Sequence, residues 1–135
     1  MKRILIILFT IHSSLFTLSA GVRDLSWYDV CAGKMPEAWY GSAEAQGIAD
    51  TVVAVQKSNG GWMKNDQLHL LSSADYQRLV NDKNGRSCLD NTATTQEMRF
   101  LARVWKATNN VSYQQAFLRG LNMIFTAQKG CGGWL

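Results

Sequence analysis

Apolar residues recur at helical spacing in three segments of the chain. In residues 42–57 the stripe consists of Ala45, Ile48, Ala49, Val52 and Val55. Residues 94–108 carry Met98, Leu101, Ala102 and Trp105, and residues 112–129 carry Tyr113, Ala116, Phe117, Leu121 and Ile124. Positions i, i+3, i+4 and i+7 lie on one face of an amphipathic helix. The pattern therefore predicts three long helices over these ranges.

Polar residues suited to helix N-termini precede these stripes. Ser42 is a suitable N-cap for the first helix. Residues 94–97 (Thr-x-x-Glu) and 112–115 (Ser-x-x-Gln) have the spacing of a capping box. Because residues 109–111 alone separate the second and third helices, we expect these two helices to form an antiparallel hairpin.

The remaining segments give weaker signals. No sustained alternation of apolar and polar residues predicts a β-strand. Residues 58–93 are expected to be mostly irregular, with Asn-Gly turns and one short helix near residues 73–80. Connections of this length tend to be functional or disordered, and Trp62, Tyr76 and Cys88 argue against disorder. The predicted fold class is all-α.

One string occurs twice. Residues 56–62 read QKSNGGW, and residues 128–134 read QKGCGGW. Each copy follows an amphipathic stripe, offers a lysine to the negative end of a helix and supplies glycines that allow a tight turn. A unit of two helices repeated after about 70 residues is typical of helical-repeat folds. We therefore expect an (α/α) toroid or solenoid of helical hairpins that is incomplete in this chain.

The first 20 residues have the layout of a secretory signal peptide. Lys2 and Arg3 precede an apolar run, and small residues follow it, with cleavage expected after Ala20. The alternative is a single membrane anchor, but the apolar run from 4 to 18 is short and interrupted by polar residues. We expect a secreted or periplasmic protein with no stable membrane anchor after signal cleavage.

Charge and cysteine content exclude several functions. The chain has a net charge of +4, and removal of Lys2 and Arg3 leaves 12 basic against 10 acidic residues, or +2. Because no basic run is present, nucleic acid is a poor candidate partner. Cys31, Cys88 and Cys131 allow at most one disulfide, unpaired thiols being equally plausible, and their spacing matches no zinc pattern.

Two strings between the predicted helices offer binding chemistry. Trp62, Lys64 and Asn65 combine an aromatic face, a cation and an amide, which suits an acidic sugar. The structural alternative is that Trp62 packs against a helix end while Lys64 is solvated. Asp90 and Asn91 provide oxygen ligands of the kind that calcium uses, although such residues also cap helices.

Four motifs follow one another along the chain. They are residues 40–50 (YGSAEAQGIAD), 56–65 (QKSNGGWMKN), 90–96 (DNTATTQ) and 128–134 (QKGCGGW). In this order they resemble the N-terminal part of the polysaccharide lyase family 10 pectate lyases. The resemblance implies a signal peptide at residues 1–20, a leader segment at 21–39, and part of an (α/α) toroid catalytic domain, truncated at the C-terminus, at 40–135.

The resemblance also implies an activity, the calcium-assisted β-elimination of polygalacturonate (pectate). It assigns Asp90 to Ca²⁺ and Trp62, Lys64, Asn65 and Asn91 to substrate binding. The family's base is an arginine that we expect beyond Leu135, so no catalytic residue is expected within this chain and the chain alone should be inactive. The sequence departs from the family where Met63 and Leu135 replace a proline and where Thr92 replaces a common glycine.

Two other functions remain open from the sequence. One is a non-catalytic helical-repeat module that binds a polysaccharide or a partner protein. The other is part of a triterpene-cyclase-like α/α barrel, because such cyclases repeat a Gln-x3-Gly-x-Trp element. Their acidic motif requires several clustered aspartates, and here Asp90 stands alone.

Overall fold

The computed structural model describes residues 21–134, and the predicted signal peptide at 1–20 lies outside this range. The described residues form helices and no β-strand, so the all-α prediction is confirmed. No helix among them is long and apolar enough to cross a membrane. The α-helices are α1 (Trp27–Ala32), α2 (Ala43–Val55), α3 (Ser73–Asn81), α4 (Thr95–Thr108) and α5 (Val111–Ala127), with short 3-10 helices at η1 (Val22–Asp24), η2 (Glu37–Gly41) and η3 (Asp90–Thr92).

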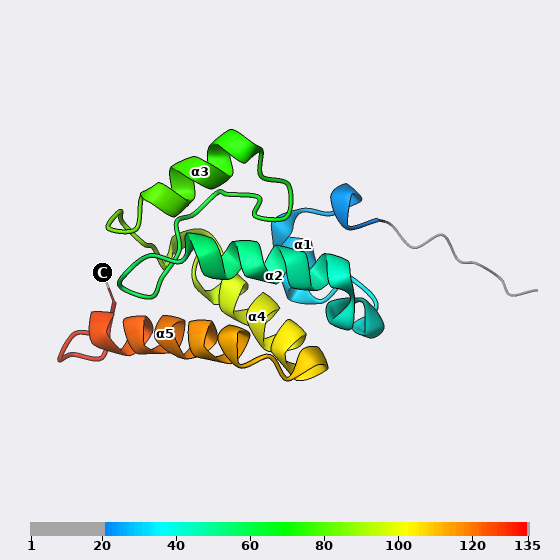
Figure 1. The fold of residues 1–135 in the computed structure, drawn as a ribbon. Helices are drawn as coiled ribbons and strands as arrows, with labels where there is room; N and C mark the ends of the chain where they lie inside the picture. The colour runs from blue at the N-terminus through cyan, green and yellow to red at the C-terminus, as the bar shows by residue number, and fades with distance from the viewer. Residues whose placement is uncertain (1–20, 135) are drawn as a thin grey trace, which may run out of the picture.

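Helix α4 lies at the centre of the arrangement. It contacts α1, α2 and α5, whereas α3 packs against α2 on the side away from the α4–α5 pair (Figure 1). Helices α4 and α5 run antiparallel and are joined by Asn109 and Asn110. The predicted hairpin is therefore confirmed.

The helix starts agree only partly with the predicted caps. The Ser42 hydroxyl accepts a hydrogen bond from the Ala45 amide at 3.2 Å, as expected of an N-cap. The two predicted capping boxes are wrong. Thr94 makes no capping hydrogen bond to α4. The N-cap of α5 is Asn110, two residues before the predicted Ser112, and its side chain accepts from the Ser112 amide at 2.9 Å.

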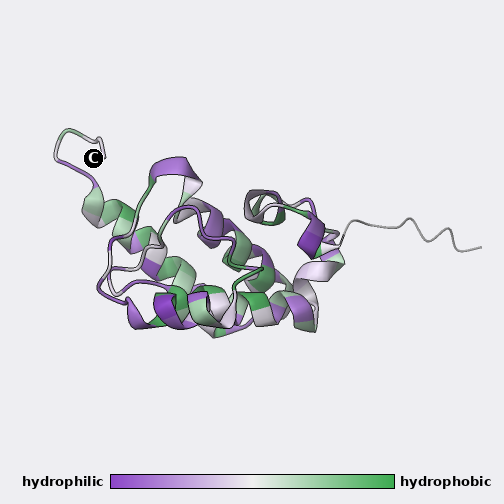
Figure 2. Ribbon diagram, turned by 90° about the horizontal axis from the view of Figure 1, so that it is seen from above, coloured by the Kyte–Doolittle hydropathy of each residue, from purple (hydrophilic) through white to green (hydrophobic). Residues whose placement is uncertain are grey.

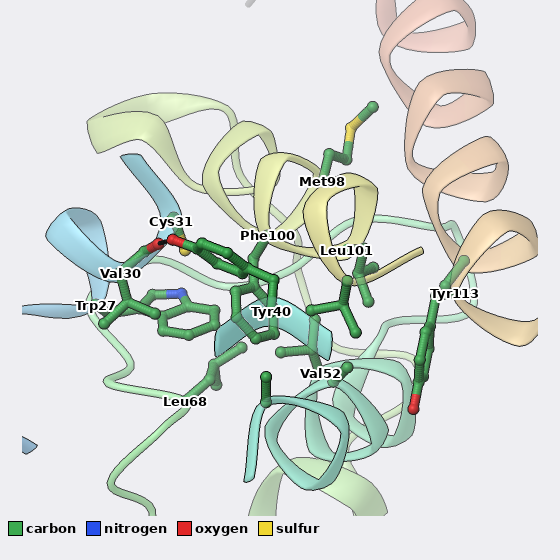
Figure 3. Close-up of a cluster of buried hydrophobic side chains, with 14 of the residues drawn as sticks. Trp27, Val30, Cys31, Tyr40, Val52, Leu68, Met98, Phe100, Leu101 and Tyr113 are labelled. Carbon is green, nitrogen blue, oxygen red and sulfur yellow. Dashed lines mark hydrogen bonds between the residues drawn. The ribbon is translucent and has the colours of Figure 1, made fainter. Parts of the chain in front are cut away.

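A cluster of aromatic and aliphatic side chains forms the core (Figure 3). Trp27 of α1 packs on Phe100 of α4 with ring centroids 4.9 Å apart, and the Tyr40 hydroxyl donates to the Val30 carbonyl at 2.7 Å. Residues from the predicted leader segment at 21–39 and from the predicted domain at 40–135 both contribute to this core. Fully buried members include Trp27, Val30, Cys31, Tyr40, Ala45, Ala49, Val52, Phe100, Leu101, Val104, Tyr113 and Ala116.

One carboxylate is buried within this core. Glu97 is 1% exposed, and its Oε1 accepts hydrogen bonds from the Trp27 indole at 2.8 Å and from the Gln96 amide at 2.9 Å. Its Oε2 has no partner among the described residues. Burial raises the pKa of Glu97 above its ordinary value. The residue that was expected to cap α4 thus ties α4 to α1.

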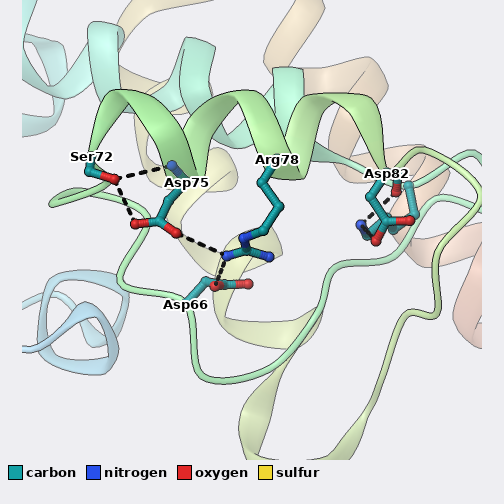
Figure 4. A network of polar contacts seen from close by, with 6 residues as sticks. Asp66, Ser72, Asp75, Arg78 and Asp82 are labelled. Carbon is teal, nitrogen blue, oxygen red and sulfur yellow. Dashed lines mark hydrogen bonds and ion pairs between the residues drawn. The ribbon is translucent and has the colours of Figure 1, made fainter.

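The long connection at residues 58–93 is ordered around α3. The Ser72 hydroxyl caps α3 by accepting from the Asp75 amide at 3.1 Å, and Arg78 reaches both Asp75 and Asp66 (Figure 4). The short helix expected near residues 73–80 is confirmed.

The lysines at the C-terminal end of α2 differ from expectation. Lys57 does not bind the carbonyls of α2; its ammonium lies 2.8 Å from the Asp82 carboxylate. Lys83 instead donates to the carbonyls of Ala54 and Gln56. A lysine ammonium does lie at the C-terminal carbonyls of α2, as expected for the negative end of a helix dipole. It comes from residue 83, at the far end of the connection.

Candidate functional site

The two segments that carry the predicted site residues lie side by side. The Cys88 amide donates to the Trp62 carbonyl at 3.0 Å, which pairs the two backbones. The Thr94 hydroxyl donates to the Cys88 carbonyl at 2.8 Å and accepts from the Trp62 amide at 3.0 Å. Because Thr94 is fully buried at the start of α4, it fixes both segments relative to that helix.

Lys64 and Asp90 form an ion pair across these segments. The Lys64 Nζ lies 2.5 Å from the Asp90 Oδ2, although the residues are 26 positions apart. The side chains are 37% and 64% exposed, so both groups can reach a ligand. The Lys64 ammonium lowers the pKa of the Asp90 carboxyl, with help from the Asn91 amide, and Asp90 raises the pKa of Lys64. Since exposed ion pairs contribute little to folding, exchanging this pair for contacts to a ligand would cost little stability.

The backbone around this pair adopts rarely populated conformations. Asn65, Asn91 and Thr92 have φ angles of 73°, 51° and 61°. Asparagine tolerates this region, whereas a β-branched threonine there is unusual. Thr92 occupies the position where the resembled family commonly has glycine, and the positive φ gives the physical reason for that preference. Strained backbone of this kind tends to occur at functional sites.

Hydrogen bonds hold the Asp90 turn. The Asn91 amide donates to the Asp90 Oδ1 at 2.9 Å, and the Asp90 amide donates to the Cys88 sulfur at 3.3 Å. The three cysteines are free thiols, with Cys31 buried and Cys131 exposed, so no disulfide constrains the site. Asp90 is therefore oriented by its own turn and by Lys64.

A groove adjoins Asp90. It has a volume of about 410 Å³ and runs between the Asp90 turn and the C-terminal half of α5. Both polar and apolar groups line it, which suits a ligand with hydroxyls on a hydrocarbon ring. The lining residues are Asn59, Ser87, Cys88, Leu89, Asp90, Met123, Thr126 and Ala127.

The structure changes the role of Trp62. This side chain is 1% exposed, and its indole N–H donates to the Val52 carbonyl of α2 at 2.8 Å. Its burial contradicts the prediction that Trp62 stacks on a sugar, because no ring face reaches solvent. The structure agrees with the alternative prediction, that Trp62 packs against the end of a helix, here α2. Lys64, Asn65 and Asn91 remain accessible.

The described residues supply only part of a calcium site. Asp90 offers an exposed carboxylate and Asn91 an exposed amide, both of them oxygen donors suited to calcium. Within residues 21–134, however, no three His, Cys, Asp or Glu side chains gather as a metal site requires. Calcium takes six to eight oxygen ligands, and the Lys64 ammonium already occupies one side of Asp90. These residues alone do not fit the ion.

Sequence reasoning missed the residues that assemble the site. Thr94 precedes a helix and therefore has the local pattern of a cap, and nothing nearby in the sequence indicates its bonds to residues 62 and 88. Cys88 contributes through its backbone and sulfur, which no motif marks. The bonds that join Trp62 to Cys88 and to Thr94 link residues far apart in sequence, and no local pattern indicates them.

Comparisons with known proteins agree on one family. A family model described as pectic acid lyase matches residues 56–135. A solved family 10 polysaccharide lyase from Cellvibrio cellulosa is similar to this chain, with 27% identity and a TM-score of 0.55. The similarity covers 80% of this chain and 29% of that lyase, and it agrees with the all-α toroid class. A search of curated proteins found no match.

Proposed function

Because the chain belongs to the pectic acid lyase family, we propose that it forms the part of an exported pectate lyase that binds an acidic sugar of polygalacturonate at Lys64 and Asp90. The observation that supports this proposal is the ion pair itself. Two exposed groups, 26 positions apart and both within the matched residues, meet at 2.5 Å beside a groove. Export follows from the predicted signal peptide, since pectate lies outside the cell that degrades it.

Each accessible residue has a role in this proposal. The Lys64 ammonium exchanges its bond to Asp90 for one to the carboxylate of the sugar. The side-chain amides of Asn65 and Asn91 bond sugar hydroxyls beside it, because amides offer both donors and acceptors. Asp90 would then be one oxygen ligand for Ca²⁺, and the other ligands would have to come from outside the described residues.

The reaction that we propose for the whole enzyme is a β-elimination. Calcium, held in part by Asp90 in the whole enzyme, would supply positive charge that neutralises the C6 carboxylate of the sugar and lowers the pKa of the C5 proton. A base takes that proton, the electron pair forms a C4–C5 double bond, and the C4–oxygen bond breaks to release the leaving chain. The base, an arginine by resemblance, is expected outside this chain. Lys64 and Asp90 hold and orient the sugar.

Calorimetric titration of the whole enzyme with an oligogalacturonate, with and without calcium, tests the binding role. We expect calcium-dependent binding that weakens at least about tenfold in Lys64→Met, since a charge-assisted bond contributes roughly 1.5–3 kcal/mol. Asp90→Asn should remove the calcium dependence. Lys106→Met removes an exposed lysine that pairs with Glu37 elsewhere, and it should bind like the wild type. Equal binding by all four proteins would refute the proposed site.

An assay for unsaturated uronide separates this proposal from the alternative of a non-catalytic binding module. The whole enzyme should release the product from polygalacturonate only with calcium, and this chain alone should release none. Binding by the whole enzyme without any product would favour the module. The family match gives no support to a triterpene cyclase.

A further inference from the structure

The first copy of the repeated string, residues 56–62, binds the side of helix α5. The Gln56 side chain is 4% exposed, and its Nε2 donates to its own Gly60 carbonyl at 2.8 Å and to the Ala116 carbonyl of α5 at 2.9 Å. Its Oε1 accepts from the Arg119 guanidinium, also on α5, at 2.9 Å. One buried glutamine therefore joins the end of α2 to the side of α5.

Glycines allow the two surfaces to approach closely. A Cβ atom at Gly60, whose φ is 96°, would collide with the Arg119 carbonyl. On the other side of the contact, a Cβ at Gly120 would lie 3.1 Å from the Trp62 ring. The first copy thus recognises an Arg-Gly pair on the docked helix: the arginine bonds to the glutamine, and the glycine lies against the tryptophan.

The second copy has the same local structure. Gln128 Nε2 donates to the Gly132 carbonyl at 2.7 Å, and the Lys129 amide bonds to the Gly133 carbonyl at 2.8 Å, as Lys57 does to Gly61 at 2.9 Å. The Trp134 indole donates to the Ile124 carbonyl at 2.8 Å, and Gly132 has a φ of 86°. Each contact repeats its counterpart in the first copy at a distance of 72 residues.

The second copy differs in what covers it. Trp134 is 48% exposed, against 1% for Trp62, and Gln128 makes no bond to a second helix among the described residues. The neighbouring face of α5 is also apolar and open, with Leu118 at 50% and Phe125 at 63% exposure. Figure 2 shows apolar residues recurring along α5 toward the C-terminal end. By contrast, Val53, the counterpart of Phe125, packs against the core.

We propose that the second copy, together with the apolar face of α5, is a docking site for an amphipathic α-helix that carries an Arg-Gly pair. The arginine donates to Gln128 Oε1, and Gln128 Nε2 donates to a backbone carbonyl of the incoming helix. The glycine lies over Trp134. This site extends the interface between α2 and α5 by one helix. Helix α2 precedes the first copy and packs against α5; helix α5 precedes the second copy and would pack against the incoming helix in the same way.

A second copy of this chain is a poorer occupant. Its own Arg-Gly pair, Arg119 and Gly120, already docks on its own Gln56 and Trp62. Offering that pair to a neighbour would require α5 to leave its place in the fold. The occupant is therefore a helix whose Arg-Gly pair is free.

NMR titration of the ¹⁵N-labelled chain with a capped peptide of residues 111–127, the sequence of α5, tests the proposal. We expect the Trp134 indole and the Gln128 side-chain amide signals to shift. Gln128→Ala and Trp134→Ala in the chain should each weaken binding at least about tenfold, as should Arg119→Ala or Gly120→Leu in the peptide. Tyr28→Ala, which removes another half-exposed aromatic side chain, is the matched control and should bind normally.

Three results would overturn the proposal. They are absence of binding, equal binding by the Trp134→Ala chain, and shifts at Gln56 and Trp62, which would mean that the peptide replaces α5. Sedimentation equilibrium of the free chain should show a monomer, and a dimer that Trp134→Ala dissociates would assign the surface to a second copy instead. None of these variants alters Lys64 or Asp90, so the outcome is independent of the proposed sugar site.

Discussion

Two glycines inside helices should respond oppositely to the same substitution. Gly47 in α2 is exposed, and a Cβ atom there would meet nothing within 4 Å. Gly47→Ala should stabilise the fold by about 0.5–1 kcal/mol, because alanine loses less backbone entropy in a helix. Gly120→Ala in α5 would gain the same helix propensity. Its added Cβ, however, would lie 2.9 Å from the Met98 Cγ and 3.1 Å from the Trp62 ring.

Overpacking of this kind costs about 1–3 kcal/mol. After subtraction of the helix gain, Gly120→Ala should destabilise the fold by roughly 0–2 kcal/mol, which places the two variants about 1–3 kcal/mol apart. Urea denaturation followed by circular dichroism measures both, and thermal melts should separate them by about 4 °C per kcal/mol. If Gly120→Ala stabilised the chain as much as Gly47→Ala, the close packing of α5 on Trp62 would be refuted.

Three further predictions concern the glutamines, the buried acid and the ion pair. Gln56→Ala should destabilise the fold by about 1–3 kcal/mol, because it removes buried hydrogen bonds. Gln128→Ala, the same change in the exposed copy, should cost less than about 0.5 kcal/mol. Equal losses of stability in urea denaturation would contradict the claim that Gln56 is buried in a contact that Gln128 lacks. Burial raises the folded-state pKa of Glu97 above its ordinary value of 4.5. The stability of the wild type relative to Glu97→Gln should therefore be greatest below pH 4.5 and should fall as the pH rises through the raised pKa. A stability difference that stayed constant between pH 4 and pH 8 would refute this. Lys64→Met should let the pKa of Asp90 return toward its ordinary value of 3.8, and an NMR titration of the carboxyl that shows no increase would contradict the pairing.

The sequence predicted the elements that depend on local patterns. The stripes in α2, α4 and α5 repeat at helical spacing because each helix buries one face, and the hairpin followed from a connection too short for any other geometry. The helix endings at Gln56 and Gln128 were equally local, since glycine marks them. Their role in docking a helix could not be predicted, because Ala116 and Arg119 lie about 60 residues from Gln56.

The errors share a physical cause. Thr94 and Glu97 have the local pattern of a capping box, but a buried contact outcompeted the cap in each case: Thr94 joins the site segments, and Glu97 accepts from Trp27. From the sequence alone, Trp62 was predicted to stack on a sugar. The fold shows that its ring is buried, partly against α5. The candidate site was predicted as two separate strings, and the pairing of Lys64 with Asp90 required the fold.

The most direct test of the proposed function is a map of where an oligogalacturonate binds. In ¹⁵N and ¹³C NMR spectra of the whole enzyme, titration with trigalacturonate and calcium should shift the Lys64 and Asp90 side-chain signals most, with smaller shifts at Asn65 and Asn91. A chelator should reverse these shifts. Shifts confined to other surfaces, or none at any concentration of sugar and calcium, would contradict the assignment of Lys64 and Asp90 as the sugar-binding pair.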